Sequence, residues 1–281
     1  MDQLPHVLWI GGPPGSGKTT VARLLARRHG LRWYNSDAHT WEHRDRAVAV
    51  GHPAAIRWEK WRGLDNATRA ATPLAEQLEM WLHHERGPMT VDDLKALPSS
   101  PMIVAEGTQI TPEVAGVGPR SVWLMPPADV RRAWLEERHK PNGPPPLYLY
   151  LGEIIEEDVR RAGGRTLVLD ATTSVEQTIA QVEQLFRDAL ATGPKAETTA
   201  ERRALLRYAN RAIVSQYRAF FARPWSPDGL DSAVASFECE CARPECDEFV
   251  ERRIVDFPDP PDDAFEPVLA ARCAALENAS R

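Results

Sequence analysis

Residues 12–19, close to the start of the chain, have types and a spacing that suit phosphate binding. They follow the pattern G-x-x-x-x-G-K-[ST], in which a lysine and a hydroxyl residue come directly after the last glycine. Glycines let the backbone approach phosphate oxygens closely, and the N–H groups of such a loop point toward the phosphate. We expect Lys18 to contact the β- and γ-phosphates of a nucleoside triphosphate, and the Thr19 hydroxyl to bind Mg²⁺. The predicted nucleotide-binding residues are Gly12, Pro13, Pro14, Gly15, Ser16, Gly17, Lys18, Thr19 and Thr20.

The segments on both sides of this loop are those that a phosphate-binding loop requires. The apolar run 7–10 predicts a buried strand, and the pattern after residue 18 predicts a helix with one apolar and one basic face. The loop would then lie at the N-terminus of a helix, where the helix dipole favours an anion. A glycine-rich turn without a ligand is the alternative, but the strand, lysine, threonine and helix in register favour the phosphate site.

Two carboxylates follow predicted strands and are candidates for the same site. Asp37 comes after the short strand predicted at 31–35, and Glu106 comes after the strand predicted at 102–105. The carboxyl ends of parallel strands meet at the edge of the sheet where ligands bind. Asp37 could orient a hydroxyl group beside the phosphate site and take up its proton; a plain helix cap is the alternative. Glu106 could hold a water on Mg²⁺ or contact the acceptor, and the alternative is a strand-end acid without a role.

A basic helix is predicted to begin after Pro127 and to end before the proline-rich segment 141–146. Phosphoryl transfer spreads negative charge over the phosphate oxygens, and guanidinium groups can stabilise that charge. Arg131 and Arg138 lie about two turns apart on one stripe of this helix, whereas Arg132 faces elsewhere. A basic helix face that is exposed to solvent is the alternative. The candidate catalytic residues are Lys18, Asp37, Arg131 and Arg138.

Predicted strands alternate with predicted helices over residues 1–192, and the strands are continuously apolar. This pattern predicts a parallel sheet that helices cover on both faces. We therefore expect an α/β domain, a three-layer sandwich of the P-loop NTPase type with a five-stranded parallel sheet. Residues 193–281 are a predicted C-terminal extension, mainly helical, in which a long helix begins at the capping box of Thr198 and Glu201. Further helices are predicted at 72–84, 90–97 and 266–276.

All four cysteines lie in the extension, and three of them are closely spaced. Thiolates are zinc ligands, and a tetrahedral structural site needs four of them. No histidine follows His139, which excludes a site within the extension that combines cysteine and histidine. Reduced, partly buried thiols are the alternative to a structural zinc site. The candidate zinc ligands are Cys239, Cys241, Cys246 and Cys273.

Composition is that of an ordinary globular protein, with 43% hydrophobic and 26% charged residues. The formal net charge of -6 argues against a nucleic-acid backbone as the main partner. No apolar run approaches the length that spans a bilayer, and residues 1–6 lack the pattern of a signal peptide. We therefore expect a cytoplasmic protein without a membrane partner. The sequence leaves the oligomeric state open.

The loop at 12–19, Asp37, Glu106 with Gly107, and the arginine-rich helix together resemble the P-loop nucleoside and small-molecule kinases. That group includes adenylate, shikimate and gluconate kinases, chloramphenicol phosphotransferase and the zeta-toxin-type kinases. The resemblance covers about two-thirds of the chain, and only the loop is a specific motif. It implies transfer of the γ-phosphate of ATP, with Mg²⁺, to a hydroxyl of a small molecule. It also implies that an aspartate at the position of Asp37 activates the acceptor or helps to hold Mg²⁺, and that the arginines belong to a mobile lid.

The same resemblance implies that the segment between the second and third strands covers the acceptor. In this chain the segment mixes tryptophans with charged residues, which suits a ring-bearing or sugar-like acceptor. A hydrophobic cap over the sheet is the alternative. The residues concerned are His39, Trp41, Glu42, His43, Arg44, Trp58, Glu59, Trp61 and Arg62.

Two other functions are compatible with the loop. A regulatory ATPase or nucleotide-operated switch could bind a partner protein through the extension, although the N-K-x-D sequence of GTPases is missing. A polynucleotide-end kinase would need a basic groove, and the net charge of -6 argues against one. The leading prediction is a kinase that acts on a small-molecule alcohol, with the alcohol and the base of the donor nucleotide left open.

Overall fold

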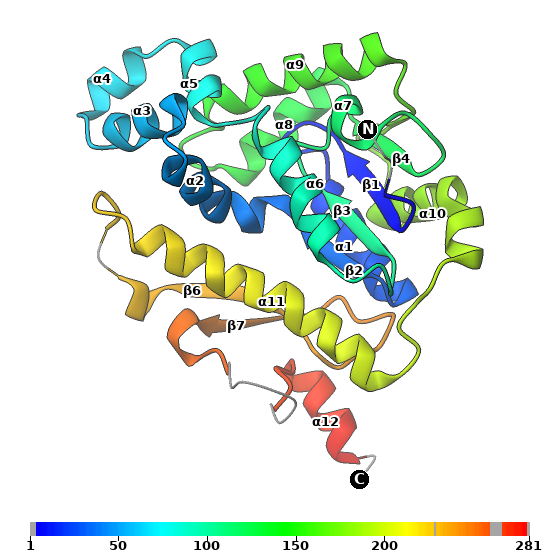
Figure 1. Cartoon of the computed structure of the whole chain (residues 1–281). Coiled ribbons are helices and arrows are strands. Elements are labelled where there is room, and N and C mark those ends of the chain that lie inside the picture. Colours follow the sequence, from blue (N-terminus) through cyan, green and yellow to red (C-terminus); the bar gives the residue numbers. More distant parts are fainter. Residues whose placement is uncertain (1–3, 228, 259–265, 280–281) are drawn as a thin grey trace.

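A five-stranded parallel sheet forms the centre of the computed structural model, which describes residues 4–227, 229–258 and 266–279 (Figure 1). Its strands are β1 (Val7–Gly11), β2 (Arg32–Asn35), β3 (Ile103–Glu106), β4 (Ser121–Met125) and β5 (Thr166–Val168). The strand order is β2-β3-β1-β4-β5. Glu106 is paired with Ile10 of β1 on one side and with Asn35 of β2 on the other. The predicted α/β fold is confirmed, and its register brings the loop that follows β1, Asp37 and Glu106 to one edge.

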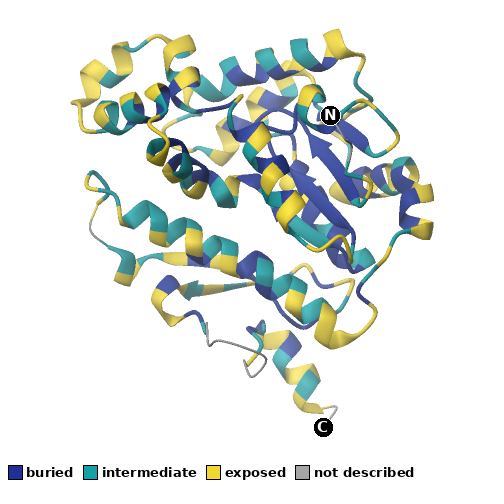
Figure 2. Cartoon of the chain, viewed as in Figure 1, coloured by how far each residue is buried: buried dark blue, intermediate teal, exposed yellow. Residues whose placement is uncertain are grey.

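Helices cover both faces of this sheet. The helices are α1 (Lys18–His29), α2 (Thr40–Ala49), α3 (Pro53–Arg62), α4 (Asn66–Ala71), α5 (Leu74–Met80), α6 (Arg86–Ala96), α7 (Pro112–Ala115), α8 (Ala128–Arg138), α9 (Pro146–Ala162), α10 (Val175–Thr192), α11 (Thr199–Phe221) and α12 (Ala271–Ala279). Leu8 and Ile10 of β1 pack with α1 and α10, whereas Val7 and Trp9 pack with α6 and α9. Figure 2 shows the strands as the most buried part of the molecule. Burial on both faces is the reason that β1, β3 and β4 are mostly apolar, whereas β2 and β5 at the two edges of the sheet are more exposed.

The segment between β2 and β3 begins with the 3-10 turn η1 (Ser36–His39) and continues with α2 to α6. The prediction of one helix over 72–84 is wrong, because α5 ends at Met80. Leu82 is fully buried with a φ of 61°, a left-handed conformation that an α-helix does not tolerate. The helix predicted at 90–97 starts earlier, at Arg86. The helices α2 to α5 lie together at one end of the sheet, whereas α6 packs on a face of the sheet (Figure 1).

The C-terminal extension is built on α11, which packs against β2, η1 and α2 (Figure 1). The capping box of Thr198 and Glu201 is present at its start, as predicted. The sequence pattern does not predict the antiparallel hairpin of β6 (Val234–Glu238) and β7 (Phe249–Arg253), because β7 is short and charged. Phe237 and Ala235 of the hairpin pack on α11 through Val214.

The last helix begins at Ala271 and not at the predicted residue 266. The preceding chain is held in extended form by Glu240, whose N–H donates to the Val268 carbonyl at 2.7 Å. In return, the Val268 N–H donates to the Glu240 carboxylate at 2.8 Å. The predicted boundary at residue 192 coincides with the end of α10, and the division into two domains stays a prediction. Within the described ranges, no helix has both the length and the apolar character that crossing a membrane requires.

Candidate active site

The loop between β1 and α1 has the backbone shape that its glycines predict. Gly12, Gly15 and Gly17 have positive φ angles of 140°, 78° and 79°. A Cβ at Gly12 would lie 2.5 Å from the carbonyl oxygen of Leu124, so a side chain does not fit there. Gly17 is the N-cap of α1, and the loop therefore leads directly into a helical turn whose unpaired N–H groups attract anions.

Lys18 is the first residue of α1 and is buried. Its Nζ donates to the carbonyl oxygen of Pro13 at 3.2 Å, so the ammonium lies against the loop backbone. Burial lowers the pKa of Lys18, and attraction to Glu106 and then to Asp37 opposes this shift. The Lys18 ammonium therefore contacts the loop backbone and is attracted to both carboxylates. In this position it could neutralise the charge of a phosphate bound at the loop.

Glu106 ends β3 and is fully buried. Its Oε2 accepts a hydrogen bond from the Thr19 hydroxyl at 3.1 Å, which joins two of the three residues predicted to hold Mg²⁺, Asp37 being the third. Among the described residues, no group donates to the Glu106 Oε1 or pairs with the Ser16 hydroxyl, although both atoms are buried. Burial raises the pKa of Glu106 to about 8. An unpartnered carboxylate oxygen on a residue that also contacts the Thr19 hydroxyl is a donor set that fits Mg²⁺, which prefers oxygen ligands.

Asp37 lies in η1 directly after β2, with its side chain about half exposed. Its N–H donates to the Asn35 side chain at 2.9 Å, which fixes the turn. Arg86 stabilises the turn. Its Nη2 donates to the Ser36 carbonyl at 2.6 Å and lies 3.9 Å from the Asp37 Oδ1. Arg86 is fully buried, and burial lowers the pKa of Arg86 while Asp37 opposes the shift. No local pattern distinguishes Arg86 from the other arginines of the sequence, so it could not be predicted.

A cavity of about 270 Å³ brings these groups together. Lys18 and Thr19 line it from the loop, Asp37 lines it from η1, and Arg138 lines it from the end of α8. The volume is close to the lower end of the range for small-molecule sites, about 300–1,000 Å³. The loop between β1 and α1 and the carboxylate of Asp37 therefore face one cavity.

The two candidate arginines of α8 lie in different places. Arg138 faces the cavity together with its neighbour His139. Arg131 is buried between α8 and α9, where its guanidinium lies against Gly152 and its Nη1 is 3.4 Å from the Glu156 carboxylate. The structure therefore places Arg138, and not Arg131, where it could reach a phosphate, because packing of α9 on α8 covers Arg131.

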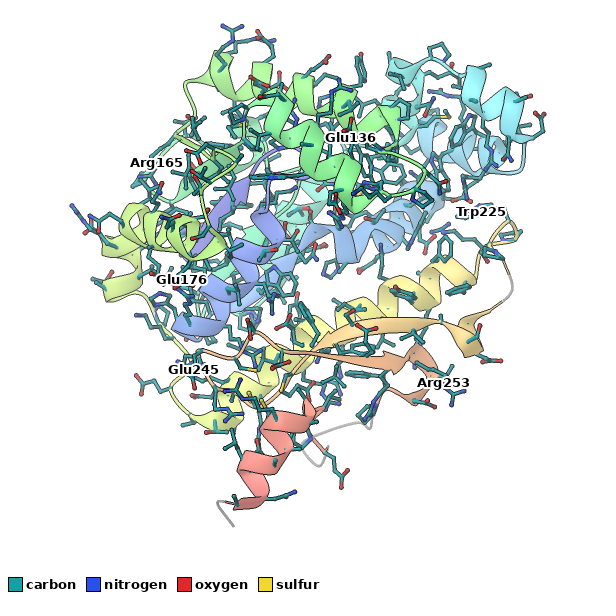
Figure 3. All side chains as sticks on the ribbon, turned by 180° about the vertical axis from the view of Figure 1, so that it is seen from behind. Glu136, Arg165, Glu176, Trp225, Glu245 and Arg253 are labelled. Carbon is teal, nitrogen blue, oxygen red and sulfur yellow. The ribbon has the colours of Figure 1, made fainter. Side chains whose placement is uncertain are left out.

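A second cavity, of about 360 Å³, adjoins the first. Trp41, Trp81 and Tyr148 line both of them. Its far wall comes from the extension, where Trp225 lies beyond the end of α11 and faces the short helices that follow η1 (Figure 3). The ring centres of Trp58 and Trp225 are 5.1 Å apart in an edge-to-face arrangement. The aromatic lining residues are Trp41, Trp58, Trp61, Trp81, Tyr148, Phe220 and Trp225.

Gln216 of α11 is a further residue of the site that the sequence pattern does not predict. It lines the cavity of 270 Å³, and its Nε2 donates to the Asp37 carbonyl at 2.8 Å. Its Oε1 accepts the N–H of Trp41 at 3.1 Å. The only sequence signal for this contact is a polar residue on an otherwise mixed helix, and its partners are about 180 residues away in the chain. The extension is therefore part of the candidate site.

Comparison with known proteins finds similar solved structures. The crystal structure of a gluconokinase from Sinorhizobium meliloti 1021 matches with 16% identity and a TM-score of 0.39, over 67% of this chain and 95% of that chain. A sugar kinase from Janibacter sp. HTCC2649 matches with 20% identity and a TM-score of 0.35, over 66% of this chain and 97% of that chain. No protein-family model matches the sequence, and no curated protein matches it.

Proposed function

We propose that this protein is an ATP-dependent phosphotransferase that transfers the γ-phosphoryl group to a hydroxyl of a small molecule. One observation carries the proposal: the phosphate-binding loop and the carboxylate of Asp37 face the same cavity of about 270 Å³. A loop without such a neighbour would fit a motor or a switch equally well. A carboxylate next to the phosphate site is what an alcohol acceptor needs.

The donor side rests on the loop. Its backbone N–H groups and Lys18 would hold the triphosphate, since both are positioned at the start of α1. Thr19 and Glu106 would hold Mg²⁺, with the Thr19 hydroxyl 3.1 Å from the Glu106 carboxylate. When bound, Mg²⁺ neutralises charge on the phosphate oxygens.

The acceptor side rests on Asp37. Its exposed carboxylate would accept the proton of the acceptor hydroxyl while the hydroxyl oxygen bonds to the γ-phosphorus. The bond between that phosphorus and the bridging oxygen breaks, and ADP leaves with the electron pair. Arg138 would stabilise the charge on the transferred group, because its side chain lines the same cavity. The half-exposure of Asp37 keeps the carboxylate accessible to the acceptor.

Acceptor-stimulated ADP release tests this proposal. With a panel of small-molecule alcohols, the wild-type chain should release ADP faster in the presence of an accepted alcohol. Asp37→Asn should lower the stimulated rate by about 100-fold or more, because general-base catalysis contributes a factor of that order. ATP binding should persist in Asp37→Asn. Asp92→Asn, which changes an exposed aspartate of α6, is the matched control and should retain the wild-type rate.

A regulatory ATPase is the competing function, and the same experiment distinguishes the two. A regulator would hydrolyse ATP at a rate that no alcohol changes, and Asp37→Asn would leave its nucleotide exchange unaltered. That pair of results would refute the kinase proposal.

A further inference from the structure

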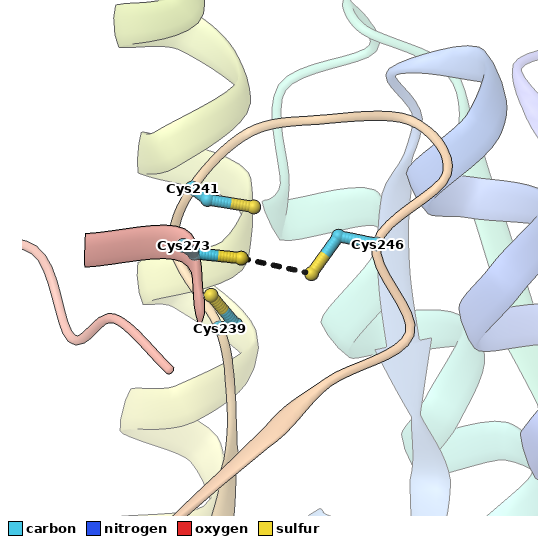
Figure 4. Close-up of side chains that lie close together, drawn as sticks. All are labelled: Cys239, Cys241, Cys246 and Cys273. Carbon is cyan, nitrogen blue, oxygen red and sulfur yellow. Dashed lines mark hydrogen bonds between the residues drawn. The ribbon is translucent and has the colours of Figure 1, made fainter. Parts of the chain in front are cut away.

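The four cysteines of the extension converge on one point, although they come from separate segments. Cys239 and Cys241 follow β6, Cys246 lies in the loop before β7, and Cys273 lies in the first turn of α12. All four side chains are buried, and their sulfur atoms lie within 4.8 Å of one another. The Cys246 and Cys273 sulfurs are 3.7 Å apart (Figure 4). Figure 4 shows the side chains directed toward a common centre.

We propose that these four thiolates bind a structural Zn²⁺. Four sulfurs at the usual Zn–S distance of about 2.3 Å form a tetrahedron with edges of about 3.8 Å, close to the observed separation. A set of four protein ligands leaves no open position for substrate, which makes the site structural and not catalytic. Thiolate ligands in a tetrahedral arrangement favour zinc over the magnesium expected at the phosphate site.

The surroundings of the cluster suit the negative charge that four thiolates around Zn²⁺ would carry. The Ala270 N–H donates to the Cys239 sulfur at 3.3 Å, and the Arg27 Nη2 donates to the Cys241 sulfur at 3.5 Å. Arg27 is buried and shares the Glu238 carboxylate with Arg23, each at 3.2 Å. Arg23 and Arg27 carry two positive charges and Glu238 carries one negative charge. The three side chains together therefore have a net positive charge beside the sulfurs. Hydrogen bonds and charges of this kind orient metal ligands and strengthen binding.

The position of the cluster explains what the metal would stabilise. Arg27 belongs to α1, the helix that begins at the phosphate-binding loop, and it also donates to the Cys239 carbonyl at 2.5 Å. Asn210 of α11 donates to the Glu238 carbonyl at 3.0 Å. A metal at this point would therefore tie α12 and the hairpin to both α1 and α11. We expect the loss of the metal to loosen the extension and, through α11, the contact with Asp37.

Metal analysis of the full-length chain tests the site. Protein purified without chelators should contain one zinc per chain, and Cys246→Ser should lose most of it. Glu245→Gln, an exposed change next to Cys246 (Figure 3), is the matched control and should keep its zinc. Because Cys246→Ser could fail to fold, the wild-type protein should also be stripped and reconstituted with Co²⁺. The expected result is the intense visible absorption of tetrahedral thiolate coordination. Wild-type protein without stoichiometric zinc and without that absorption, or with iron in its place, would overturn the proposal.

The aromatic cavity carries a second inference, which rests on the proposed function. We infer that the acceptor is an alcohol carried on an aromatic or apolar ring system. Because Trp41, Trp81 and Tyr148 line both cavities, a ring in the aromatic cavity could present its hydroxyl to the space beside Asp37. Ring stacking on tryptophan provides the binding energy for such a ligand.

The polar groups of this cavity support the same ligand class. Glu59 fixes the position of Trp225 in the wall of the cavity. Its carboxylate accepts hydrogen bonds from the Trp225 Nε1 at 2.7 Å and from the Arg223 Nη1 at 2.8 Å. Arg62 stacks on Trp225, 4.6 Å from the ring centre, and its buried Nε has no partner among the described residues. Apart from Arg62 and Gln77, the described lining residues are apolar or aromatic. Most hydroxyl groups of a polyol would find no hydrogen-bond partner in this cavity. A ring compound with one hydrogen-bond acceptor could instead pair that acceptor with Arg62.

Matched alcohols test this inference. Aromatic alcohols and sugar polyols should be compared for direct binding by calorimetry and for phosphate transfer from ATP. We expect the aromatic alcohols to bind more tightly, and Trp61→Ala to raise their KM about tenfold without changing the KM for ATP. Leu64→Ala, an exposed change outside the cavity, should leave both values unaltered.

The results of these binding and transfer assays distinguish failure of the proposed acceptor class from failure of the proposed kinase activity. Preferred transfer to polyols would overturn the acceptor class but leave the kinase proposal intact. Binding of aromatic alcohols without any transfer would overturn the kinase proposal and support the ligand class. If no aromatic alcohol binds, the inference is wrong.

Discussion

Gln216 holds the backbone of Asp37 from a helix that lies about 180 residues further along the chain. Its side-chain amide donates to the Asp37 carbonyl at 2.8 Å and accepts the N–H of Trp41 at 3.1 Å. One residue of α11 therefore joins the turn that carries the proposed acceptor-activating carboxylate to the first ring of the aromatic cavity. The extension thus contributes directly to the geometry of the candidate site.

Replacing Gln216 tests this positioning role. Gln216→Ala removes both hydrogen bonds, and Gln216→Glu removes only the donation to Asp37. We expect both variants to lower kcat about tenfold, which corresponds to about 1.4 kcal/mol. Binding of ATP should not change, and the free energy of unfolding should fall by only about 1 kcal/mol. Kinetics at varied acceptor concentration make the measurement, with Ser215→Ala on the exposed side of α11 as control. An unchanged kcat in both variants would contradict the role.

Glu106→Gln tests the proposed Mg²⁺ site. The amide still fills the space at the end of β3, but unlike the carboxyl group, whose pKa is raised to about 8, it cannot give up a proton and become negatively charged when the cation binds. We expect Mg²⁺ to strengthen nucleotide binding in the wild type, and this effect to fall by about 10–100-fold in the variant. Calorimetry with and without Mg²⁺ gives the answer, with the exposed Glu113→Gln of α7 as control. If Mg²⁺ acts equally on both proteins, Glu106 does not hold it.

The burial of His83 leads us to predict that the free energy of unfolding depends on pH. Burial lowers the pKa of His83 from the ordinary 6.5 to about 3. Below pH 6.5 the unfolded chain takes up a proton that the folded chain does not, so the free energy of unfolding falls as the pH drops from 6.5 toward 3. At pH 5 this loss amounts to about 2 kcal/mol for one group.

His83→Leu should remove this loss, while the exposed neighbour His84→Leu should retain it. Urea denaturation at pH 7 and pH 5 measures the difference for the two variants and the wild type. The same pH dependence in His83→Leu as in the wild type would show that another group is responsible.

Two glycines of the loop should differ in their tolerance of alanine. Gly12→Ala would place a methyl group 2.5 Å from the Leu124 carbonyl oxygen, whereas Gly17→Ala meets no atom within 4 Å. Both positions have a positive φ, so both substitutions strain the backbone, and only Gly12→Ala adds a collision with backbone. We expect Gly12→Ala to lower the free energy of unfolding by at least about 1 kcal/mol more than Gly17→Ala. Chemical denaturation without nucleotide measures this, and equal losses would refute the argument.

Local patterns were enough to predict the shape of the loop after β1 and the two strand ends that lie beside it. Gly12, Lys18 and Thr19 are close in sequence, and the polar residues Asp37 and Glu106 follow short strands that the register of the sheet brings together. Arg131 shows the limit of this reasoning, because a helical stripe gives direction but does not reveal that α9 covers it. Gln216 and Trp225 could not be predicted either, since their roles depend on how α11 packs against η1 and α2.

The central claim is that the γ-phosphate moves to an alcohol, and tracing that phosphate tests it most directly. ATP labelled at the γ-phosphate should be incubated with the wild-type chain, Mg²⁺ and the alcohol panel, and the products separated and identified by phosphorus NMR. The account predicts a labelled phosphate ester of an alcohol, which Asp37→Asn forms at about one-hundredth of the wild-type rate or less. Label found only in inorganic phosphate, at a rate that no alcohol changes, would contradict it.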